Sequence, residues 1–462
     1  MSDEEIELSE NTQKKSTKGT MDMTTGNSKL LILRFALPVF ISQLFQQLYN
    51  TADSVIVGRF LGKSELAAVS SSGNLIFLIN SFFIGISVGA GVVIAKYFGA
   101  KDERNVSRAI HTDFFFGLMA GLALTAFGVL ATPTILRWMK TDEEVLPYSI
   151  LYFRYYFLGA LGMILYNIQT GIMNAVGDSK RPLVYLIISS CLNVTLDILF
   201  IAVLHKGVQW AAIATVISQT TSAVLCLIHL VKPGRIYQLQ IRKIRPHADM
   251  MKEILKNGIP TGVQNSVIGF ANVLVQSNIN TFGEDAMAGY GSYAKVEGFA
   301  FLPITCFSMA LSTFVSQNLG AKKPERAKEG ARFGIIACLI LAEIIGILMY
   351  VFAPTLIGFF NEDPEVIRYG VLQARTVDLF CFLLAFSHVI SGICRGAGKA
   401  FVPMIVMLSV WCVLRITYIT IAMQIDHNIQ LLFWAYPLTW SISSIIFLIY
   451  YKKSNWLGEQ KA

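Results

Sequence analysis

The sequence predicts an all-α integral membrane protein with twelve transmembrane helices in two pseudo-symmetric six-helix lobes. Three observations support this fold class: an apolar composition, regularly spaced apolar runs of bilayer length, and an internal repeat. Of the 462 residues, 54% are hydrophobic and 15% are charged, whereas an ordinary soluble domain carries about 25% charged residues. The mean hydropathy is +0.55. The seven cysteines fall inside apolar runs without metal-ligand spacing, which predicts buried thiols.

Apolar runs of bilayer length alternate with short charged loops from Leu30 onward. The runs cover residues 30–58, 66–95, 107–131, 149–175, 182–204, 209–231, 254–281, 287–318, 330–353, 365–395, 402–424 and 430–451. Residues 1–29 are polar and lack the basic-then-apolar order of a signal peptide, which predicts a cytoplasmic tail. The expected domains are this tail (1–29), an N-terminal lobe (30–231), a basic cytoplasmic linker (232–253), a C-terminal lobe (254–451) and a second cytoplasmic tail (452–462).

The distribution of positive charge predicts the orientation of the chain. When alternate loops are assigned to one side, 28 of the 38 Lys and Arg residues fall on the side of the N-terminal tail and six on the other. Because cytoplasmic loops carry an excess of Lys and Arg, both termini and the basic linker are predicted to be cytoplasmic. We therefore expect a multi-pass protein of the cytoplasmic membrane. The net charge of +8 is then explained by the orientation of the chain in the membrane, and no nucleic-acid partner is predicted.

The two halves of the chain resemble each other at a shift of 221 residues. The segment GIMNAVGDSKRP (171–182) recurs as GICRGAGKAFVP (392–403), and the Gly-Ala-Lys turn at 99–101 recurs at 320–322. Such repeats in membrane proteins usually enclose a central substrate path that each half opens to one side. Pro38 and Pro260 lie early in the first helix of each half. Either they bend these helices during transport or they only accommodate packing.

Asp53 and Asp197 lie within apolar runs of the N-terminal half. An ionised carboxylate in hydrocarbon costs several kcal/mol, so Asp53 in the first run should face a bundle interior or a wet cavity, unless it caps the outer helix end. Asn193 and Asp197 are four residues apart and share one face of the fifth helix. If that face meets the first helix, the two acids form a pair that can bind a proton. Alternatively, Asp197 forms a structural ion pair with Arg154 or Arg415.

The same pair of acids suits a sodium ion equally well. Hard cations prefer oxygen ligands, and neutral oxygens are available from Asn193, from Thr215 and from Tyr152. Under the repeat shift, the polar positions of the N-terminal half map to an apolar stretch near Val275, to Leu414 and to Tyr418. We therefore expect the N-terminal lobe to handle the cation.

Uncharged amides form a stripe on the first and on the seventh apolar run. The stripes consist of Gln43, Gln46, Gln47 and Asn50, and of Gln264, Asn265, Asn272, Gln276 and Asn280. The first stripe follows the spacing of a single helical face, which favours a water-accessible substrate cleft. The alternative is hydrogen bonding that only joins helices. In the eighth run, Lys295 and Glu297 are further substrate-path candidates, and Glu297 either attracts a cationic compound or balances Arg375.

These residues together resemble the multidrug and toxic compound extrusion (MATE) family. The features that carry the resemblance are two six-helix halves, a Pro followed by Asp53 in the first span, the two Gly-Ala-Lys turns, and Asn193 with Asp197 in the fifth span. The resemblance implies a V-shaped pair of lobes and a cation site at Asp53, Asn193 and Asp197, with Tyr152 and Thr215 beside it. If the ion is Na⁺, the first three residues are its ligands.

The resemblance also implies a function. Members of the family export mostly cationic amphipathic compounds in exchange for H⁺ or Na⁺ by alternating access. This implies a secondary antiporter rather than an enzyme, working as a monomer in the lipid bilayer, with no cofactor beyond the coupling ion. The sequence contains no Gly-rich phosphate loop. Two alternatives stay open: a lipid-linked oligosaccharide flippase of the same superfamily, and a membrane receptor or scaffold that transports nothing.

One branch of the family carries acids in the seventh and tenth spans. The stretch 258–276 has no acid, and the stretch 379–396 has only His388 as a titratable group besides Arg395 and two cysteines. The sequence therefore predicts no sodium site in the C-terminal lobe.

Overall fold

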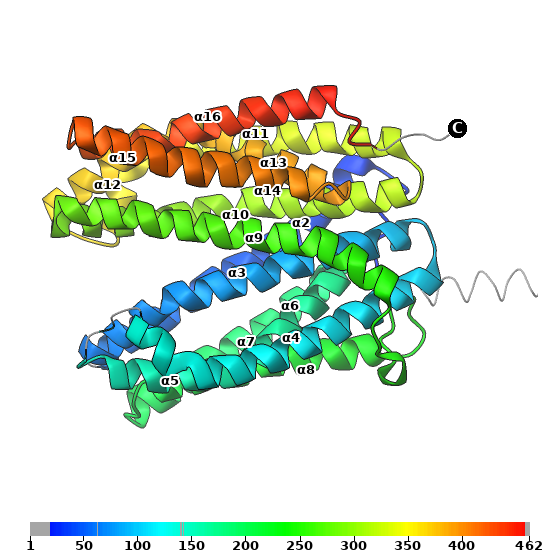
Figure 1. The fold of residues 1–462 in the computed structure, drawn as a ribbon, viewed down its shortest axis with the longest axis horizontal. Helices are drawn as coiled ribbons and strands as arrows, with labels where there is room; N and C mark the ends of the chain where they lie inside the picture. Colours follow the sequence, from blue (N-terminus) through cyan, green and yellow to red (C-terminus); the bar gives the residue numbers. More distant parts are fainter. Residues whose placement is uncertain (1–18, 62, 139–140, 142, 458–462) are drawn as a thin grey trace, which may run out of the picture. The chain divides into compact units, whose positions relative to one another are not determined.

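The computed structural model describes residues 19–457 except 62, 139, 140 and 142, and within that range the side chains of 54, 63–68 and 70–75 are not described. Every regular element in the described part of the chain is a helix, which confirms the all-α fold class (Figure 1). In the first half the helices are α2 (Ser28–Phe60), α3 (Lys63–Gly99), α4 (Glu103–Trp138), α5 (Leu146–Leu158), α6 (Ala160–Ala175), α7 (Lys180–Asp197), η1 (Ile198–Val203), α8 (Gln209–Val231) and η2 (Ile241–Lys243). In the second half they are α9 (Ala248–Ile279), η3 (Asn280–Phe282), α10 (Glu284–Gly320), α11 (Pro324–Gly358), α12 (Pro364–Val377), η4 (Asp378–Phe380), α13 (Cys381–Gly396), α14 (Phe401–Met407), η5 (Leu408–Leu414), α15 (Arg415–Ile425) and α16 (Ile429–Lys453).

Each predicted span falls on one helix or on consecutive helical segments. Among the described residues, ten helical stretches are long and apolar enough to cross a membrane, and the pair α5–α6, bent by 45°, makes an eleventh. The remaining predicted span is α9, which has 32 residues and is therefore long enough. Its hydropathy is lower because the amides of the second predicted stripe interrupt its apolar sequence.

Contacts between residues divide the chain into two compact units. Unit 1 comprises Met1–Asp22 and Ile41–Gly258, and unit 2 comprises Met23–Phe40 and Ile259–Ala462. The divisions fall inside α2, just after Pro38, and inside α9, just before Pro260. A proline within a helix removes one backbone hydrogen bond. Each of these two helices therefore passes from one unit to the other close to the point where its hydrogen-bond ladder is interrupted. The lobe boundaries predicted above follow the loops instead and stay a prediction.

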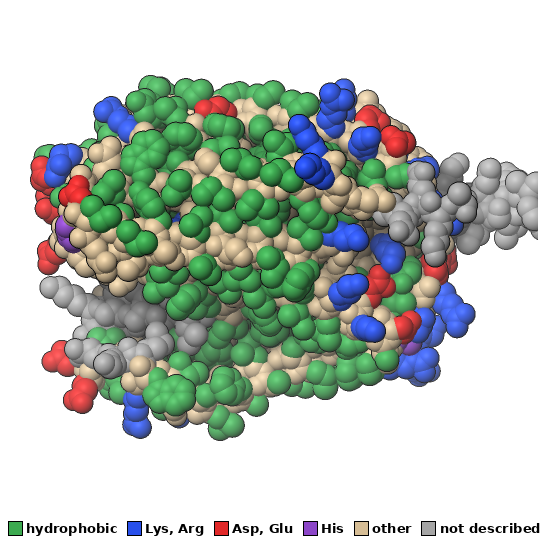
Figure 2. Space-filling view, turned by 45° about the horizontal axis from the view of Figure 1, so that its top comes forward, with side chains coloured by type: hydrophobic (Ala, Val, Ile, Leu, Met, Phe, Trp, Pro, Cys, Tyr) green, Lys and Arg blue, Asp and Glu red, His purple; other side chains and the backbone are tan. Residues whose placement is uncertain are grey.

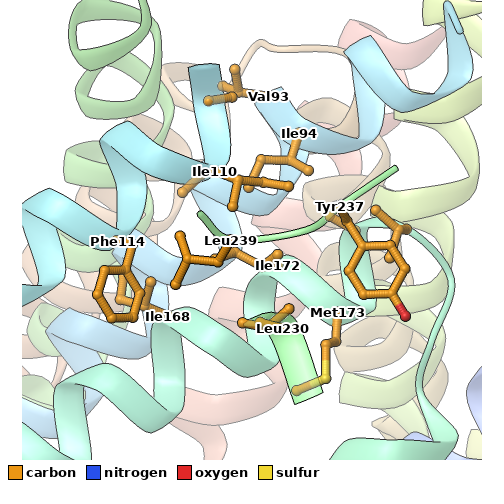
Figure 3. Packing of buried hydrophobic residues seen from close by; sticks show 14 of the residues in the cluster. Val93, Ile94, Ile110, Phe114, Ile168, Ile172, Met173, Leu230, Tyr237 and Leu239 are labelled. Carbon is orange, nitrogen blue, oxygen red and sulfur yellow. The ribbon is translucent and has the colours of Figure 1, made fainter. Parts of the chain in front are cut away.

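The core of unit 1 is built around α6. Buried side chains of α3, α4, α6 and α8 meet there, among them Ile94, Ile110, Ile172 and Leu230 (Figure 3). The segment after α8 adds Tyr237 and Leu239, both with 0% exposure. The backbone N–H of Leu239 donates to the carbonyl of Leu230 at 2.8 Å. Part of the predicted basic linker is thus packed into the core of unit 1.

In unit 2, α10 packs against α11, α12 and α13, and α13 also packs against α16 (Figure 1). The surface of both units is apolar along the helix flanks, whereas Lys and Arg side chains gather near helix ends (Figure 2). Large hydrophobic side chains are widely exposed, for example Leu130 at 79%, Ile340 at 57% and Val413 at 64%. Such exposure is costly in water and expected of helices that face lipid.

The internal repeat extends to single contacts. In unit 1, a Cβ on Gly171 would collide with Ser87, and the Ser87 hydroxyl donates to the carbonyl of Asn167 at 2.6 Å. In unit 2, a Cβ on Gly392 would collide with Ser308, whose hydroxyl donates to the carbonyl of His388 at 2.7 Å. These partners are all 221 residues apart. The glycines are needed because two helices approach each other at these points.

Candidate functional site

The two predicted coupling acids lie together in unit 1. Asp53 belongs to the part of α2 that is in unit 1, and Asp197 is the last residue of α7. Their carboxyl groups lie close to each other. Asp197 has 0% exposure, and Asn193, one turn earlier on α7, has 2%. The structure therefore brings together the three residues that the sequence singled out as cation ligands.

No protein group neutralises this pair in the described part of the chain. Both carboxylate oxygens of Asp197, Oδ1 of Asp53 and both amide atoms of Asn193 have no hydrogen-bond partner. None of the ion pairs between described residues includes either acid. Two unit charges about 4 Å apart repel by about 4 kcal/mol at an effective dielectric constant of 20. A proton or a cation bound between the carboxylates removes this repulsion.

The alternatives for these acids do not match their surroundings. Asp53 lies about two turns before the end of α2 at Phe60, so it is not an end cap. Arg154 is exposed. Arg415 belongs to unit 2, where its Nη2 donates to the hydroxyl of Thr439 at 2.8 Å. Neither arginine forms the predicted ion pair with Asp197 among the described contacts.

Tyr152 and Thr215 occupy different places around the acids. Tyr152 on α5 is 6% exposed, lies close to both Asp53 and Asp197, and stacks on Tyr156 with a centroid distance of 6.3 Å. Thr215 on α8 donates to the carbonyl of Ala211 at 3.2 Å. Its side chain lines a cavity that begins at Asn193. Tyr152 is thus placed at the acids, and Thr215 is part of the cavity wall.

This cavity in unit 1 is small, with room for about one water molecule. Its lining residues are Gln46, Tyr49, Tyr166, Leu186, Ser189, Ser190, Asn193, Thr215, Ser218, Gln219 and Ser222. Sequence reasoning did not single out its serines. A signal was present, because Ser189, Asn193 and Asp197 on α7, like Ser218 and Ser222 on α8, follow the four-residue spacing of a helical face.

The remaining amides of the first stripe lie in unit 1 beside this cavity. Gln46 lines it, Gln43 and Gln47 are partly buried, and Asn50 is exposed. The backbone carbonyl of Gln47 accepts from the hydroxyl of Thr51 at 2.9 Å.

The amides of the second stripe belong to unit 2. Gln264 is 2% exposed, and its Nε2 donates to Ser391 Oγ at 3.3 Å and lies 2.8 Å from Met407 Sδ. Asn272 is exposed, and Gln276 donates to Asn280 at 3.0 Å. Gln264 therefore fits the helix-joining alternative. A cleft between the two stripes stays a prediction.

Unit 2 contains a buried acid that sequence reasoning overlooked. Asp378 in η4 has 0% exposure; its Oδ1 accepts from the Tyr293 hydroxyl at 2.7 Å, and its Oδ2 has no partner. It lies one residue before the stretch 379–396, in which no acid was found. The statement that the tenth span lacks an acid was therefore wrong. The residue lies inside the tenth predicted run, 365–395, where the helix is interrupted by a short 3₁₀ segment.

The eighth-span candidates lie near this acid. Glu297 on α10 is close to Asp378 and to Arg415. The Lys295 side chain is exposed, with its Nζ 5.4 Å from the ring centroid of Phe360. Arg375 lies 6.0 Å from the ring of Tyr350, and no ion pair joins it to Glu297 among the described residues.

Comparison with known proteins shows where this fold belongs. The MatE family model matches the chain twice, over residues 38–199 and 260–421, in agreement with the internal repeat. "Probable multidrug resistance protein YoeA" of Bacillus subtilis is 30% identical over 433 residues, which cover 90% of this chain and 92% of that protein. A second relative, the "FAD transporter" of Shewanella oneidensis, is 23% identical and covers 73% of this chain and 76% of its own length.

Solved structures agree in fold. The crystal structure of "MATE in complex with MaL6" superposes with a TM-score of 0.89 at 23% identity, covering 95% of this chain and 98% of that chain. An outward-facing multidrug resistance MATE transporter of the MOP superfamily gives the same TM-score and coverage. These structures have twelve helices, which confirms the predicted fold class. The two matches of the family model and the similarity over nearly the whole chain show that this protein belongs to the MatE family and is a membrane transporter rather than an enzyme.

Proposed function

We propose that this transporter exports amphipathic, mostly cationic organic compounds across the cytoplasmic membrane in exchange for H⁺ or Na⁺ by alternating access. Relatives named multidrug resistance or multidrug export proteins support the substrate class. The observation that carries the coupling mechanism is the adjacent pair Asp53–Asp197, which no described residue neutralises and in which Asp197 is fully buried and Asp53 half-buried.

The pair explains how an inward-moving cation drives export. With both carboxylates charged, unit 1 holds two like charges in a buried site, which is unfavourable. Binding one cation removes most of that cost, so the loaded and empty forms differ in free energy by several kcal/mol. A difference of this size can bias a two-state equilibrium between inward- and outward-open forms. A proton is shared by the carboxyl groups alone, whereas Na⁺ also uses oxygens of Asn193 and Tyr152.

Orientation and assembly belong to the same proposal. The excess of Lys and Arg on one side supports cytoplasmic termini. Because each unit has its own compact core and the candidate coupling site lies entirely within unit 1, one copy of the chain carries all the parts of the mechanism.

Efflux of ethidium from cells that express the protein tests the coupling site. Asp53→Asn and Asp197→Asn should each abolish efflux at unchanged expression, because an amide takes up no proton near neutral pH and carries no negative charge to attract Na⁺. Glu343→Gln is the matched control, since this half-buried acid of α11 accepts one backbone hydrogen bond from Phe382 and an amide oxygen keeps that contact. Efflux that persists in both Asn variants would contradict the proposal.

Proteoliposomes identify the ion. Ethidium transport should follow an imposed pH gradient or an imposed Na⁺ gradient, applied separately, and should not require ATP. A strict requirement for ATP would overturn the antiport mechanism.

A second candidate substrate class is an anionic dinucleotide. One relative is named a FAD transporter, and unit 2 contains Arg395, which is 9% exposed and among the described residues donates only to Ser391 and Ser308, at 2.9 and 3.0 Å. No ion pair between described residues includes this arginine, so it is available to an anion. Transport of FAD but not of ethidium in the same liposomes would favour this candidate.

A further inference from the structure

We propose that unit 1 contains its own hydrated path for a small cation, which leads from Asp53 and Asp197 through the serine-lined cavity between α7 and α8 to the predicted cytoplasmic end of the unit. The polar side chains that line the proposed path all belong to unit 1. That the coupling ion uses this path rests on the function proposed above.

The size and chemistry of the cavity suit water or a small cation better than a drug. It has room for about one water molecule, whereas ligand pockets span about 300–1,000 Å³ and are mostly apolar. Here, eight of the eleven lining residues are Ser, Thr, Asn or Gln. A bulky amphipathic compound would find little apolar surface, whereas hydroxyl and amide oxygens are good partners for a hydrated ion.

Two polar side chains of the cavity lack partners. Ser190 is 6% exposed and Asn193 is 2% exposed, and neither the Ser190 hydroxyl nor the Asn193 amide has a hydrogen-bond partner among the described residues. Buried polar groups are almost always hydrogen-bonded, if necessary to ordered water. These two side chains line the same cavity, so they call for water or a cation inside it.

The cavity begins at Asn193, one helical turn from Asp197, and runs along two packed helices. On α7, Ser189, Asn193 and Asp197 repeat every four residues and share a face, and Tyr185 continues this face by one more turn. On α8, Ser218 and Ser222 do the same, and α7 packs against α8. From Asp197 to Tyr185 the helix rises about 18 Å, at 1.5 Å per residue.

A hydrogen-bonded cluster lies at the far end of this line. The hydroxyl of Tyr185 is 3.1 Å from His229 Nδ1, and His229 Nε2 is 3.3 Å from the hydroxyl of Tyr237. Tyr237 donates to Asp178 Oδ2 at 3.2 Å, and Asp178 also pairs with Arg181. Burial, followed by the charge of Asp178, raises the pKa of Tyr237 to about 12, which keeps this hydroxyl a donor at neutral pH.

The cluster reaches the surface of the unit. The Arg181 side chain is 30% exposed, whereas that of Asp178 is 2% exposed. Arg235 joins from the segment after α8 and donates to the carbonyl of His229 at 2.7 Å. Polar groups therefore continue from the buried end of the line to the residues that flank the predicted basic linker.

Between cavity and cluster lies a layer about one helical turn thick. It contains Leu186, which lines the cavity, and Cys226, which has 0% exposure and lies four residues after Ser222 and three before His229. An apolar layer of this kind prevents a continuous leak of ions through the unit. The path is closed in this structure, and the side chains of this layer must move for an ion to pass.

A purely structural role for the serines is the competing explanation. Ser189, Ser218 and Ser222 donate to backbone carbonyls of their own helices at 2.8–3.0 Å, which is common in membrane helices. Their oxygens keep lone pairs free to accept a bond from water. This explanation leaves Ser190 and Asn193 without any partner.

Cysteine labelling distinguishes the two explanations. Ser190→Cys and Ser222→Cys, each combined with Cys191→Ser, are exposed to the small cationic reagent MTSEA in inside-out and right-side-out vesicles, and labelling is read peptide by peptide by mass spectrometry. Ile188→Cys in the same background is the matched control, because Ile188 lies on α7 and is 46% exposed on the lipid-facing surface.

We expect Ser190→Cys and Ser222→Cys to react at least about tenfold faster than Ile188→Cys from the cytoplasmic side, because a thiol must ionise in water to react. Labelling as slow as that of Ile188→Cys at both positions would overturn the path. Equal labelling from both sides would also overturn a path that leads to one side. Each variant is first shown to elute as a folded, monodisperse protein. If the control Ile188→Cys does not fold, Thr220→Cys, at an exposed position of α8, takes its place as the control.

A blocking variant tests whether the coupling ion uses the path. Ser222→Leu should fill the cavity and slow ion-driven ethidium transport severalfold, while Thr221→Leu, on the adjacent face of α8, should not. If labelling shows water in the cavity but Ser222→Leu transports normally, the path exists and the coupling ion does not use it. If the antiport proposal itself fails, the labelling result is unaffected, because it does not depend on transport.

Discussion

Replacing Asp197 by Asn should stabilise the protein while abolishing transport. In the native chain, Asp197 is fully buried beside Asp53, and neither of its oxygens has a partner among the described residues. The amide of the Asp197→Asn variant removes one of the two like charges, and its N–H can donate a hydrogen bond to the Asp53 carboxylate. A hydrogen bond to a charged group contributes about 1.5–3 kcal/mol, and the repulsion removed is at most about 4 kcal/mol. We therefore expect a net gain of about 1–3 kcal/mol.

Thermal unfolding of the purified protein in detergent at neutral pH, without added Na⁺, measures the gain in stability. Ethidium efflux from cells measures the loss of transport. Asp53→Asn should behave similarly. The double variant should be no more stable than either single variant, because one substitution already removes the shared repulsion. This non-additivity is the signature of direct coupling between the two side chains.

A specific result would refute this reasoning. If Asp197→Asn is less stable than the native protein, the carboxylate has a stabilising partner and the pair is structural. If the two single effects add in the double variant, the acids do not interact. In both cases the coupling site would have to lie elsewhere.

Three further predictions concern packing and the cluster around Tyr237. Gly392→Ala should destabilise the protein by about 1–3 kcal/mol, because the new Cβ collides with Ser308 where α13 meets α10; Gly291→Ala on α10, which has open space around its Cα, should be neutral or stabilising in the same melting assay. Tyr237→Phe should cost about 1–3 kcal/mol, because it leaves buried Asp178 with one donor fewer; an unchanged melting temperature would contradict this. The raised pKa of Tyr237, about 12 against an ordinary 10, means that its hydroxyl adds stability below pH 10, and that this contribution is lost as the pH rises through 12. Denaturation curves between pH 9 and 12 should therefore fall more steeply for the native protein than for Tyr237→Phe.

Local chemistry explains why the helices and the repeat could be predicted. Bilayer thickness demands long apolar runs wherever a helix crosses the membrane, so the spans are visible in hydropathy alone. The Gly-Ala-Lys turns are also visible in the sequence. The same local backbone geometry recurs in both, because each turn places its lysine at positive φ, 59° at Lys101 and 58° at Lys322. The glycines at 171 and 392 recur because the same close helix crossing occurs in both halves.

Other features depend on contacts between distant segments. The cavity serines were not predicted, because a serine in an apolar helix commonly bonds to its own backbone and then carries no functional signal. The burial of Tyr237 and Leu239 was hidden by the basic residues around them. Asp378 is visible within the tenth apolar run, but that its Oδ1 accepts from the Tyr293 hydroxyl depends on tertiary packing.

The sequence by itself determined the apolar spans, their division into two similar halves, and the unusual acids within those spans, because bilayer thickness and the cost of buried charge act on every residue independently of its neighbours. Only the tertiary structure decided that Asp53 and Asp197 are adjacent without a counter-charge, and that serines of α7 and α8 line one cavity beside them. Such proximity depends on how helices rotate and pack against one another, and no periodicity within a single helix specifies that rotation.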